Sequence, residues 1–119
     1  FLADFIGDAN LVDGMLSVDG SGARFSAGGV SAPVRADGLA PGPATLALRP
    51  QRLRVVAAGQ GAVPGTCRRS AYLGSRHELI VDTPWGELLV FDADMQHGHR
   101  AGDALGLAFA PDAVIVLPR

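Results

Sequence analysis

The sequence has 119 residues, of which 48% are hydrophobic and 18% are charged, and its formal net charge is −2. This length and apolar content suit one domain, or two small lobes with a common core, and argue against a disordered chain. The near-neutral charge argues against a general nucleic-acid binder, and no apolar run approaches the roughly 20 residues that a membrane helix needs.

Residues 1–7 form a dense apolar stretch in which Phe1 and Phe5 are four positions apart. That spacing places two side chains on one face of a helix, and Gly7 is a typical helix end. No capping residue precedes Phe1. We therefore expect 1–7 to be the end of a linking helix and the chain to be a fragment or a processed product.

Beyond Gly7, sixteen Gly and eight Pro divide the chain into short runs rich in Val, Leu and Ile. Turn dipeptides such as Asp19-Gly20 and Gly28-Gly29 separate them. Short strands at this spacing, with no long segment of helical period, predict an all-β barrel or sandwich. The expected strands are Asn10–Val18, Ala23–Ser26, Ser31–Ala36, Ala44–Leu48, Leu53–Ala57, Gly65–Leu73, His77–Thr83, Glu87–Asp92, Ala104–Phe109 and Val114–Leu117.

An internal repeat gives the organisation of the chain. Residues 44–56 and 105–117 both read as a strand, a Pro break, two polar or small residues and a second strand. Two similar β lobes are therefore predicted, at 8–58 and 59–119. Chance similarity between β-rich segments is the alternative. The first lobe has shorter strands and more Gly, Ser and Pro.

No catalytic motif is present in the sequence. It contains no phosphate-binding loop ending in Gly-Lys-Ser/Thr, no dinucleotide fingerprint and no nucleophile elbow. Cys67 is the single cysteine, so it forms no internal disulfide, and we interpret it as an apolar filler on a strand. We expect no enzyme activity from this chain.

One loop has the composition of a metal site. Two carboxylates and two imidazoles could bind a divalent ion, although their spacing matches no zinc motif. The alternative is a solvated polar loop between two strands, and we predict no metal centre. The four residues are Asp92, Asp94, His97 and His99.

Six of the ten arginines fall between Arg49 and Arg76. They suit either a solvated β face or a surface that contacts a partner. Trp85 lies in a turn, where it could cap a barrel or be exposed for a partner. The residues predicted as partner contacts are Arg49, Arg52, Tyr72, Arg76 and Trp85.

Four short motifs occur in a characteristic order. They are 1–10 (FLADFIGDAN), Leu48-Arg49-Pro50, Tyr72-Leu73-Gly74 with its following hairpin, and Gly102-Asp103 before Leu107-Ala108-Phe109. Together they resemble the C-terminal transport-associated OB (TOBE) domain in ATP-binding subunits of bacterial ABC importers for polyamines, ferric ion and sugars. Gln51 stands where the family usually has Glu, which puts any ion pair of that Glu in doubt.

The resemblance implies an all-β fold of small OB-like barrels. It also implies an accessory, regulatory domain that supports dimerisation of the ATPase and senses a substrate or regulator in some members. It implies a homodimer through the parent ATPase, membrane permease subunits as partners, and a cytoplasmic location at the inner face of the cell membrane. ATP and Mg would bind in an upstream domain, so no cofactor and no catalytic residue is expected in this chain.

Two other functions remain open from the residues alone. The first is a β domain that binds a small-molecule effector or an oxyanion between its lobes or between protomers. The second is an OB-type nucleic-acid-binding module, although the small number of aromatic side chains and the near-neutral charge lead us to predict no nucleic-acid partner.

Overall fold

The computed structural model describes residues 9–20, 22–36, 38–72, 74, 77–92 and 99–119. Across these residues the chain forms ten strands and one 3-10 turn, η1 (Pro50–Arg52), which confirms the predicted all-β fold. The helix predicted at 1–7 lies outside the described residues. Within them, no helix has the length and apolarity that a membrane crossing requires. The strands are β1 (Asn10–Asp19), β2 (Gly22–Ala27), β3 (Val30–Val34), β4 (Gly42–Leu48), β5 (Arg54–Val56), β6 (Val63–Tyr72), β7 (His77–Thr83), β8 (Gly86–Asp92), β9 (Ala104–Ala108) and β10 (Val114–Pro118).

The first sheet has the strand order β10-β4-β1-β2-β3, and all neighbouring strands are antiparallel. Apolar and exposed positions alternate along β1: Val12 and Leu16 are buried, whereas Met15 is exposed. The β2–β3 hairpin turns at Gly28 and Gly29, whose φ angles of +57° and +82° are those of a type I′ turn.

The second sheet has the order β5-β9-β6-β7-β8, again antiparallel. β7 and β8 form the predicted hairpin, in which Leu79 and Val81 are fully buried and Ile80 on the other face is half-buried. A register shift between Cys67 and Arg69 interrupts the pairing of β6 with β7. Such a bulge increases the local twist of a strand, which helps the sheet to curl.

Two connections cross between the sheets in opposite directions. η1 leads from β4 in the first sheet to β5 in the second, and residues 109–113 lead from β9 back to β10 in the first. β4 pairs with β10 and β5 pairs with β9, so the two copies of the repeat run antiparallel beside each other. The structure therefore differs from the lobes predicted at 8–58 and 59–119, because each repeat contributes one strand to each sheet.

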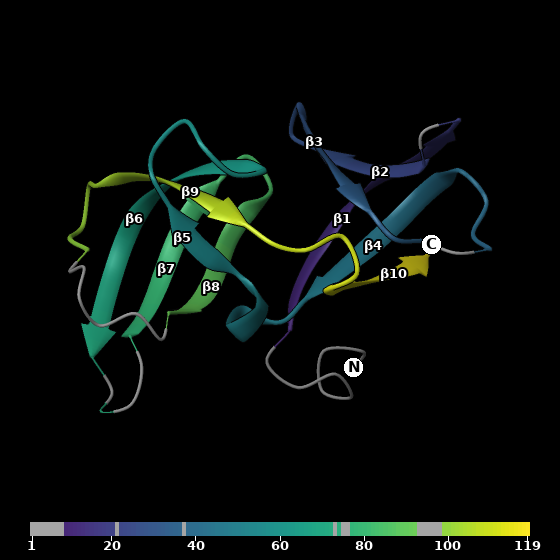
Figure 1. Cartoon of the computed structure of the whole chain (residues 1–119). Coiled ribbons are helices and arrows are strands. Elements are labelled where there is room, and N and C mark those ends of the chain that lie inside the picture. The colour runs from purple at the N-terminus through teal and green to yellow at the C-terminus, as the bar shows by residue number, and fades with distance from the viewer. Residues whose placement is uncertain (1–8, 21, 37, 73, 75–76, 93–98) are drawn as a thin grey trace.

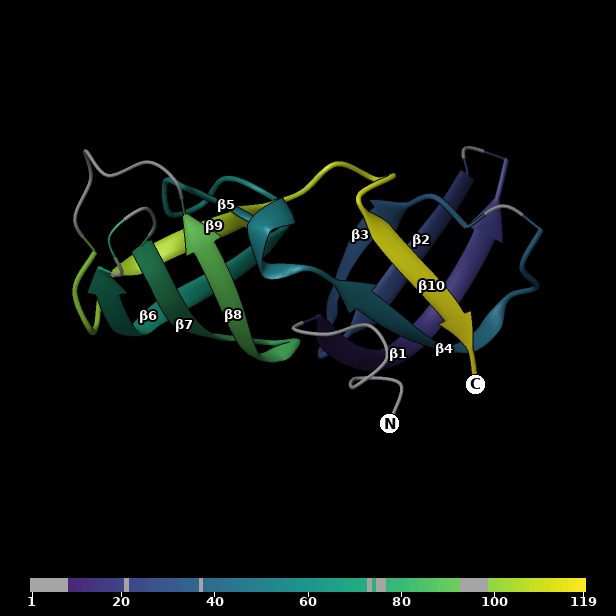
Figure 2. The ribbon, with the colours of Figure 1, turned by 90° about the horizontal axis from the view of Figure 1, so that it is seen from below.

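The two sheets curl into OB-like barrels that lie side by side and join where the connections cross (Figures 1 and 2). Their buried apolar side chains form one continuous cluster, which includes Phe25 from the first sheet and Leu79 from the second. The backbone N–H of Arg35, just after β3, donates to the oxygen of Pro111, just before β10, at 2.8 Å. This bond links the two edges of the first barrel. The lobes thus share one core.

Candidate functional site

Trp85 lies at the junction of the two lobes and not on the surface. Its side chain is 6% exposed, its indole N–H donates to the oxygen of Val30 at 3.0 Å, and its ring packs edge-on against Phe25 with centroids 5.4 Å apart. The ring of Phe109, in the second crossing connection, also packs against the indole, with ring centroids 6.0 Å apart. The expectation that Trp85 contacts a partner is therefore corrected: burial and the bond to Val30 give the indole a structural role between the barrels.

The turn that contains Trp85 presses closely on the first lobe. A Cβ atom on Gly28 would overlap the carbonyl of Pro84, so the hairpin β2–β3 and the turn β7–β8 meet backbone to backbone. Only glycine fits at this approach, where φ is also positive. The contact fixes the position of one barrel against the other.

Arg49 directly precedes η1 and Arg52 is its last residue, and both side chains are exposed. They border a shallow hollow of about 160 Å³ that Asp112 and Ile115 also line. Within the described part of the chain, no ion pair involves either guanidinium group. The structure thus brings these two predicted contact residues together at the first crossing.

Tyr72 lies apart from them, at the end of β6, and is 52% exposed. Its ring stacks on His77 with centroids 4.2 Å apart and an interplanar angle of 10°. His77 is 1% exposed, and neither of its ring nitrogens has a hydrogen-bond partner among the described residues. Arg76, the other contact residue predicted nearby, lies outside the described residues.

His77 is a residue that sequence reasoning missed, and it stands next to Asp92 and His99 of the polar loop that was considered as a metal site. His77 in β7 lies directly opposite Asp92 in β8. Its ring stacks on the ring of His99, with centroids 5.8 Å apart. Nε2 of His99 lies 3.6 Å from Oδ2 of Asp92. Asp94 and His97 lie outside the described residues. Among those described, no three His, Cys, Asp or Glu side chains are placed to hold a metal ion.

Cys67 faces the interior of the second barrel and is 1% exposed. Its Sγ lies 3.7 Å from the oxygen of Arg69. Burial raises the pKa of the Cys67 thiol above its ordinary value, and the negative charge of Asp103 raises the pKa further, against a smaller opposing effect of the bond to Arg69. A nucleophilic cysteine needs a lowered pKa and access to solvent, and Cys67 has neither.

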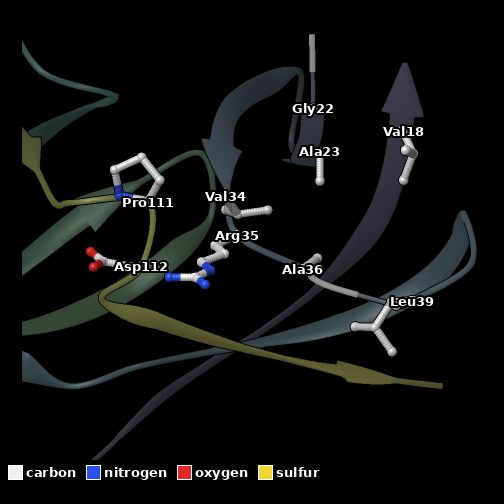
Figure 3. A pocket seen from close by; sticks show the side chains of 10 residues that line it. Val18, Gly22, Ala23, Val34, Arg35, Ala36, Leu39, Pro111 and Asp112 are labelled. Carbon is white, nitrogen blue, oxygen red and sulfur yellow. The ribbon is translucent and has the colours of Figure 1, made fainter. Parts of the chain in front are cut away.

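Each lobe has an open cavity lined by described residues. The cavity in the second lobe measures about 660 Å³ and includes His99 and Arg54 in its walls. The cavity in the first lobe measures about 570 Å³, and Figure 3 shows the side chains of Arg35 and Asp112 beside each other at one end of it. Its other walls are mostly apolar. The lining residues are Val18, Gly22, Ala23, Val34, Arg35, Ala36, Gly38, Leu39, Pro111 and Asp112.

Comparisons with known proteins find a matching family, relatives by sequence and a solved structure with the same fold. The family described as TOBE domain matches residues 46–117. The Fe(3+) ions import ATP-binding protein FbpC of Agrobacterium fabrum is 36% identical over 110 residues, which cover 92% of this chain and 31% of that protein. The spermidine/putrescine import ATP-binding protein PotA 1 of Pseudomonas aeruginosa is 36% identical over 124 residues, covering 98% of this chain and 34% of that protein. The chain thus spans about a third of the length of these relatives.

A solved structure shows the same fold. The cytoplasmic molybdate-binding protein ModG, with molybdate bound, superimposes with a TM-score of 0.76 and 15% sequence identity. The superposition covers 92% of this chain and 96% of that one. It agrees with the OB-like barrels described above.

Proposed function

The chain belongs to the TOBE domain family, and from this premise we propose that it is an accessory domain of the ATP-binding subunit of an ABC importer. Its relatives are such subunits, and the TOBE domain is a part of them that has no catalytic role. On this proposal the domain supports dimerisation of the ATPase at the inner face of the membrane, below permease subunits. ATP and Mg²⁺ bind to a domain outside these 119 residues.

The observation that supports this role is the double crossing between the lobes. Two connections run in opposite directions between the sheets, and one core lies across them. Separating the barrels would expose this shared apolar core to water, so the two lobes are held together as one rigid body. A rigid body attached to each subunit of a dimer can hold the two at a fixed separation, which a flexible domain could not do.

The test uses the full-length protein and a version that lacks residues 10–119. Sedimentation velocity measures the dimer affinity of both without nucleotide, and the ATPase rate is measured against protein concentration. We expect at least a tenfold weaker dimer without the domain, with activity recovering at high concentration. Unchanged ATP binding by the shortened protein verifies that the rest is folded. Equal dimer affinities of the two proteins would contradict the proposal.

A second candidate function is binding of an oxyanion. The fold shared with ModG and the Arg35 guanidinium group at the cavity of Figure 3 favour it. A ligand that binds only the folded chain stabilises it by mass action, by about 2.7 kcal/mol when the ligand concentration is 100 times Kd. The melting temperature rises as a result. Molybdate should therefore raise the melting temperature of the chain, and Arg35→Met should abolish the shift. A shift that persists in Arg35→Met places binding elsewhere, and no shift at millimolar molybdate removes this candidate.

A further inference from the structure

The cavity in the second lobe, of about 660 Å³, plays no part in the proposed function. Cavities that bind small molecules typically measure about 300–1,000 Å³ and combine apolar walls with a few polar groups. Part of the wall comes from β5 and from the start of β9, which pair side by side in the second lobe (Figure 1). Val55, Val56 and Leu105 supply apolar surface there. The size and the walls of this cavity therefore suit a small organic molecule.

Two charged side chains in the wall have no oppositely charged partner among the residues that the structure describes. They are Arg54 on β5 and Asp103, which directly precedes β9. Oδ2 of Asp103 accepts a hydrogen bond from the backbone N–H of Arg100 at 2.9 Å, which restrains the carboxylate. A cation and an anion that face one cavity without pairing call for a ligand that carries both charges.

The two charges lie far apart along the cavity. Arg54 is the register partner of Ala108, and a rise of about 3.4 Å per residue puts Asp103 roughly 17 Å from that position along the chain. An extended dipeptide is about 7 Å long, and a hydrogen bond of about 2.9 Å at each end lengthens its reach to about 13 Å. The two protein side chains cover the remainder. A single amino acid, with both charges on one carbon, bridges much less of this span.

His99 is a third polar group in the wall, and it is held from three directions. The hydroxyl group of Ser70 donates to the oxygen of His99 at 2.6 Å, and Nε2 lies 3.6 Å from Oδ2 of Asp92. The ring also stacks on the buried ring of His77. These contacts leave Nδ1 for a ligand. A peptide group has one N–H and one C=O, so it can bond to this nitrogen in either tautomer.

We propose that this cavity binds a short linear zwitterion, namely a dipeptide with an aliphatic side chain. Its carboxylate pairs with Arg54, its ammonium group pairs with Asp103, and its peptide group bonds to His99. The aliphatic side chain packs against Val55 and Leu105. The charged hydrogen bonds at the two ends orient the ligand, because such bonds are about twice as strong as neutral ones. This site is separate from the cavity of Figure 3.

The first test uses isothermal titration calorimetry of the 119-residue chain with L-alanyl-L-leucine. Peptide concentrations up to about 10 mM cover dissociation constants into the millimolar range. The N-acetylated dipeptide lacks the ammonium charge, and the dipeptide amide lacks the carboxylate. Each should bind at least about tenfold more weakly, because one protein charge is left without its partner. Leucine alone should be weaker by a similar factor, because it cannot reach both ends.

Two variants assign the ends of the ligand. Arg54→Gln removes the guanidinium group, so this variant should bind the dipeptide and its amide equally. Asp103→Asn keeps an oxygen that can accept from Arg100 but removes the charge, so this variant should bind the dipeptide and its N-acetyl form equally. Both variants should bind the unblocked dipeptide at least about tenfold more weakly than the wild type. A variant that only disturbed the fold would weaken all the peptides alike.

Arg69→Gln is the matched control, because it makes the same change of charge at an exposed position of β6 outside the cavity wall. Arg35→Met is the control for the cavity in the first lobe. Both should bind the dipeptide as the wild type does. Trp85 fluorescence verifies that each variant is folded.

Four results would overturn the inference. They are no heat with the dipeptide at the highest concentration, equal binding of leucine and the dipeptide, equal loss in Arg69→Gln, and a loss in Arg35→Met in place of Arg54→Gln. None of them bears on the dimer affinity of the full-length protein, which is measured separately. The inference can therefore fail while the proposed function stands, and the reverse also holds.

Discussion

Asn10, the first residue of β1, forms two hydrogen bonds with the backbone of Leu89 in β8. Its Nδ2 donates to the oxygen of Leu89 at 2.8 Å, and the N–H of Leu89 donates to its Oδ1 at 2.9 Å. The side-chain amide thus imitates a neighbouring strand. β8 is an edge strand of the second sheet, and edge strands leave backbone groups unpaired. Asn10 satisfies two of these groups and links the first sheet to the second.

This pair predicts a specific effect of removing the donor. In Asn10→Asp, the side chain has no N–H for the oxygen of Leu89 and places a negative charge beside it. We expect a loss of about 1–3 kcal/mol in the free energy of unfolding, because a part-buried acceptor is left unpaired. Urea denaturation followed by circular dichroism measures it.

Gln51→Glu is the matched control for this variant. It also converts an amide to a carboxylate, at an exposed position in η1. Its effect should stay within about 0.5 kcal/mol, as for most surface substitutions. An equal loss in both variants would show that the added charge, and not the bond to Leu89, is responsible.

The buried position of Trp85 gives a second prediction. Trp85→Phe retains an aromatic ring against Phe25 but loses the bond to Val30, so about 1 kcal/mol of stability should be lost. Trp85→Ala should lose about 3–5 kcal/mol. Because Trp85 is the single tryptophan, wild-type fluorescence reports on this site alone. Emission at the wavelength of a fully hydrated indole would contradict the burial.

A third prediction concerns Gly14 in the middle of β1. A Cβ atom there would overlap the oxygen of Ser26 and lie 2.6 Å from Cζ of Phe25. Gly14→Ala should therefore lower stability by about 1–3 kcal/mol, because the core must shift to admit the methyl group. Gly20→Ala is the control, since no atom outside its immediate chain neighbours lies within 4 Å of its Cβ position. A calorimetric melting temperature that falls equally in both variants would refute the packing argument.

The fourth prediction concerns the protection of Cys67. The thiolate is the reactive form, and both burial and the raised pKa of the Cys67 thiol disfavour it in the folded chain. A disulfide reagent should react at least about 100-fold more slowly with the native chain than with the urea-unfolded chain, because reaction requires opening of the core. Rapid reaction of the native chain at neutral pH would show that Cys67 is accessible.

The same pKa change has a consequence for stability at high pH. The folded state holds the thiol protonated, whereas the unfolded thiol ionises near its ordinary pKa of about 8.5. The contribution of Cys67 is thus fully present below that pH and is lost as the pH rises toward the higher folded-state pKa. Cys67→Ala should remove this part of the pH dependence above about pH 8.5, and an unchanged slope in the variant would assign it to other groups.

The strands were predictable from the sequence because the features that define a strand and a turn involve residues close together in the chain. Alternating apolar positions such as Val12 and Leu16 define a strand with one buried face, and Gly28-Gly29 supplies the turn that a hairpin needs. All ten expected strands are present to within a few residues. The order of short motifs also indicated the TOBE family, which the match over residues 46–117 confirms.

The candidate site was less predictable, because burial depends on residues distant in the chain. The Pro84-Trp85-Gly86 turn has the same local sequence whether the indole faces solvent or the other barrel. Its burial follows from contacts with Phe25 and Val30, more than 50 positions away. His77 likewise stands beside Asp92 only because β7 and β8 pair in that register.

The sequence by itself determined which segments are strands, where the chain turns, and that one two-strand segment is repeated. Side-chain alternation and turn chemistry act between neighbours in the chain, so these features are visible without the fold. Only the tertiary structure decided that β5 joins the second sheet and β10 the first. That choice depends on antiparallel pairing between the repeats and on closing one core around Phe25 and Leu79, and both involve residues far apart in sequence.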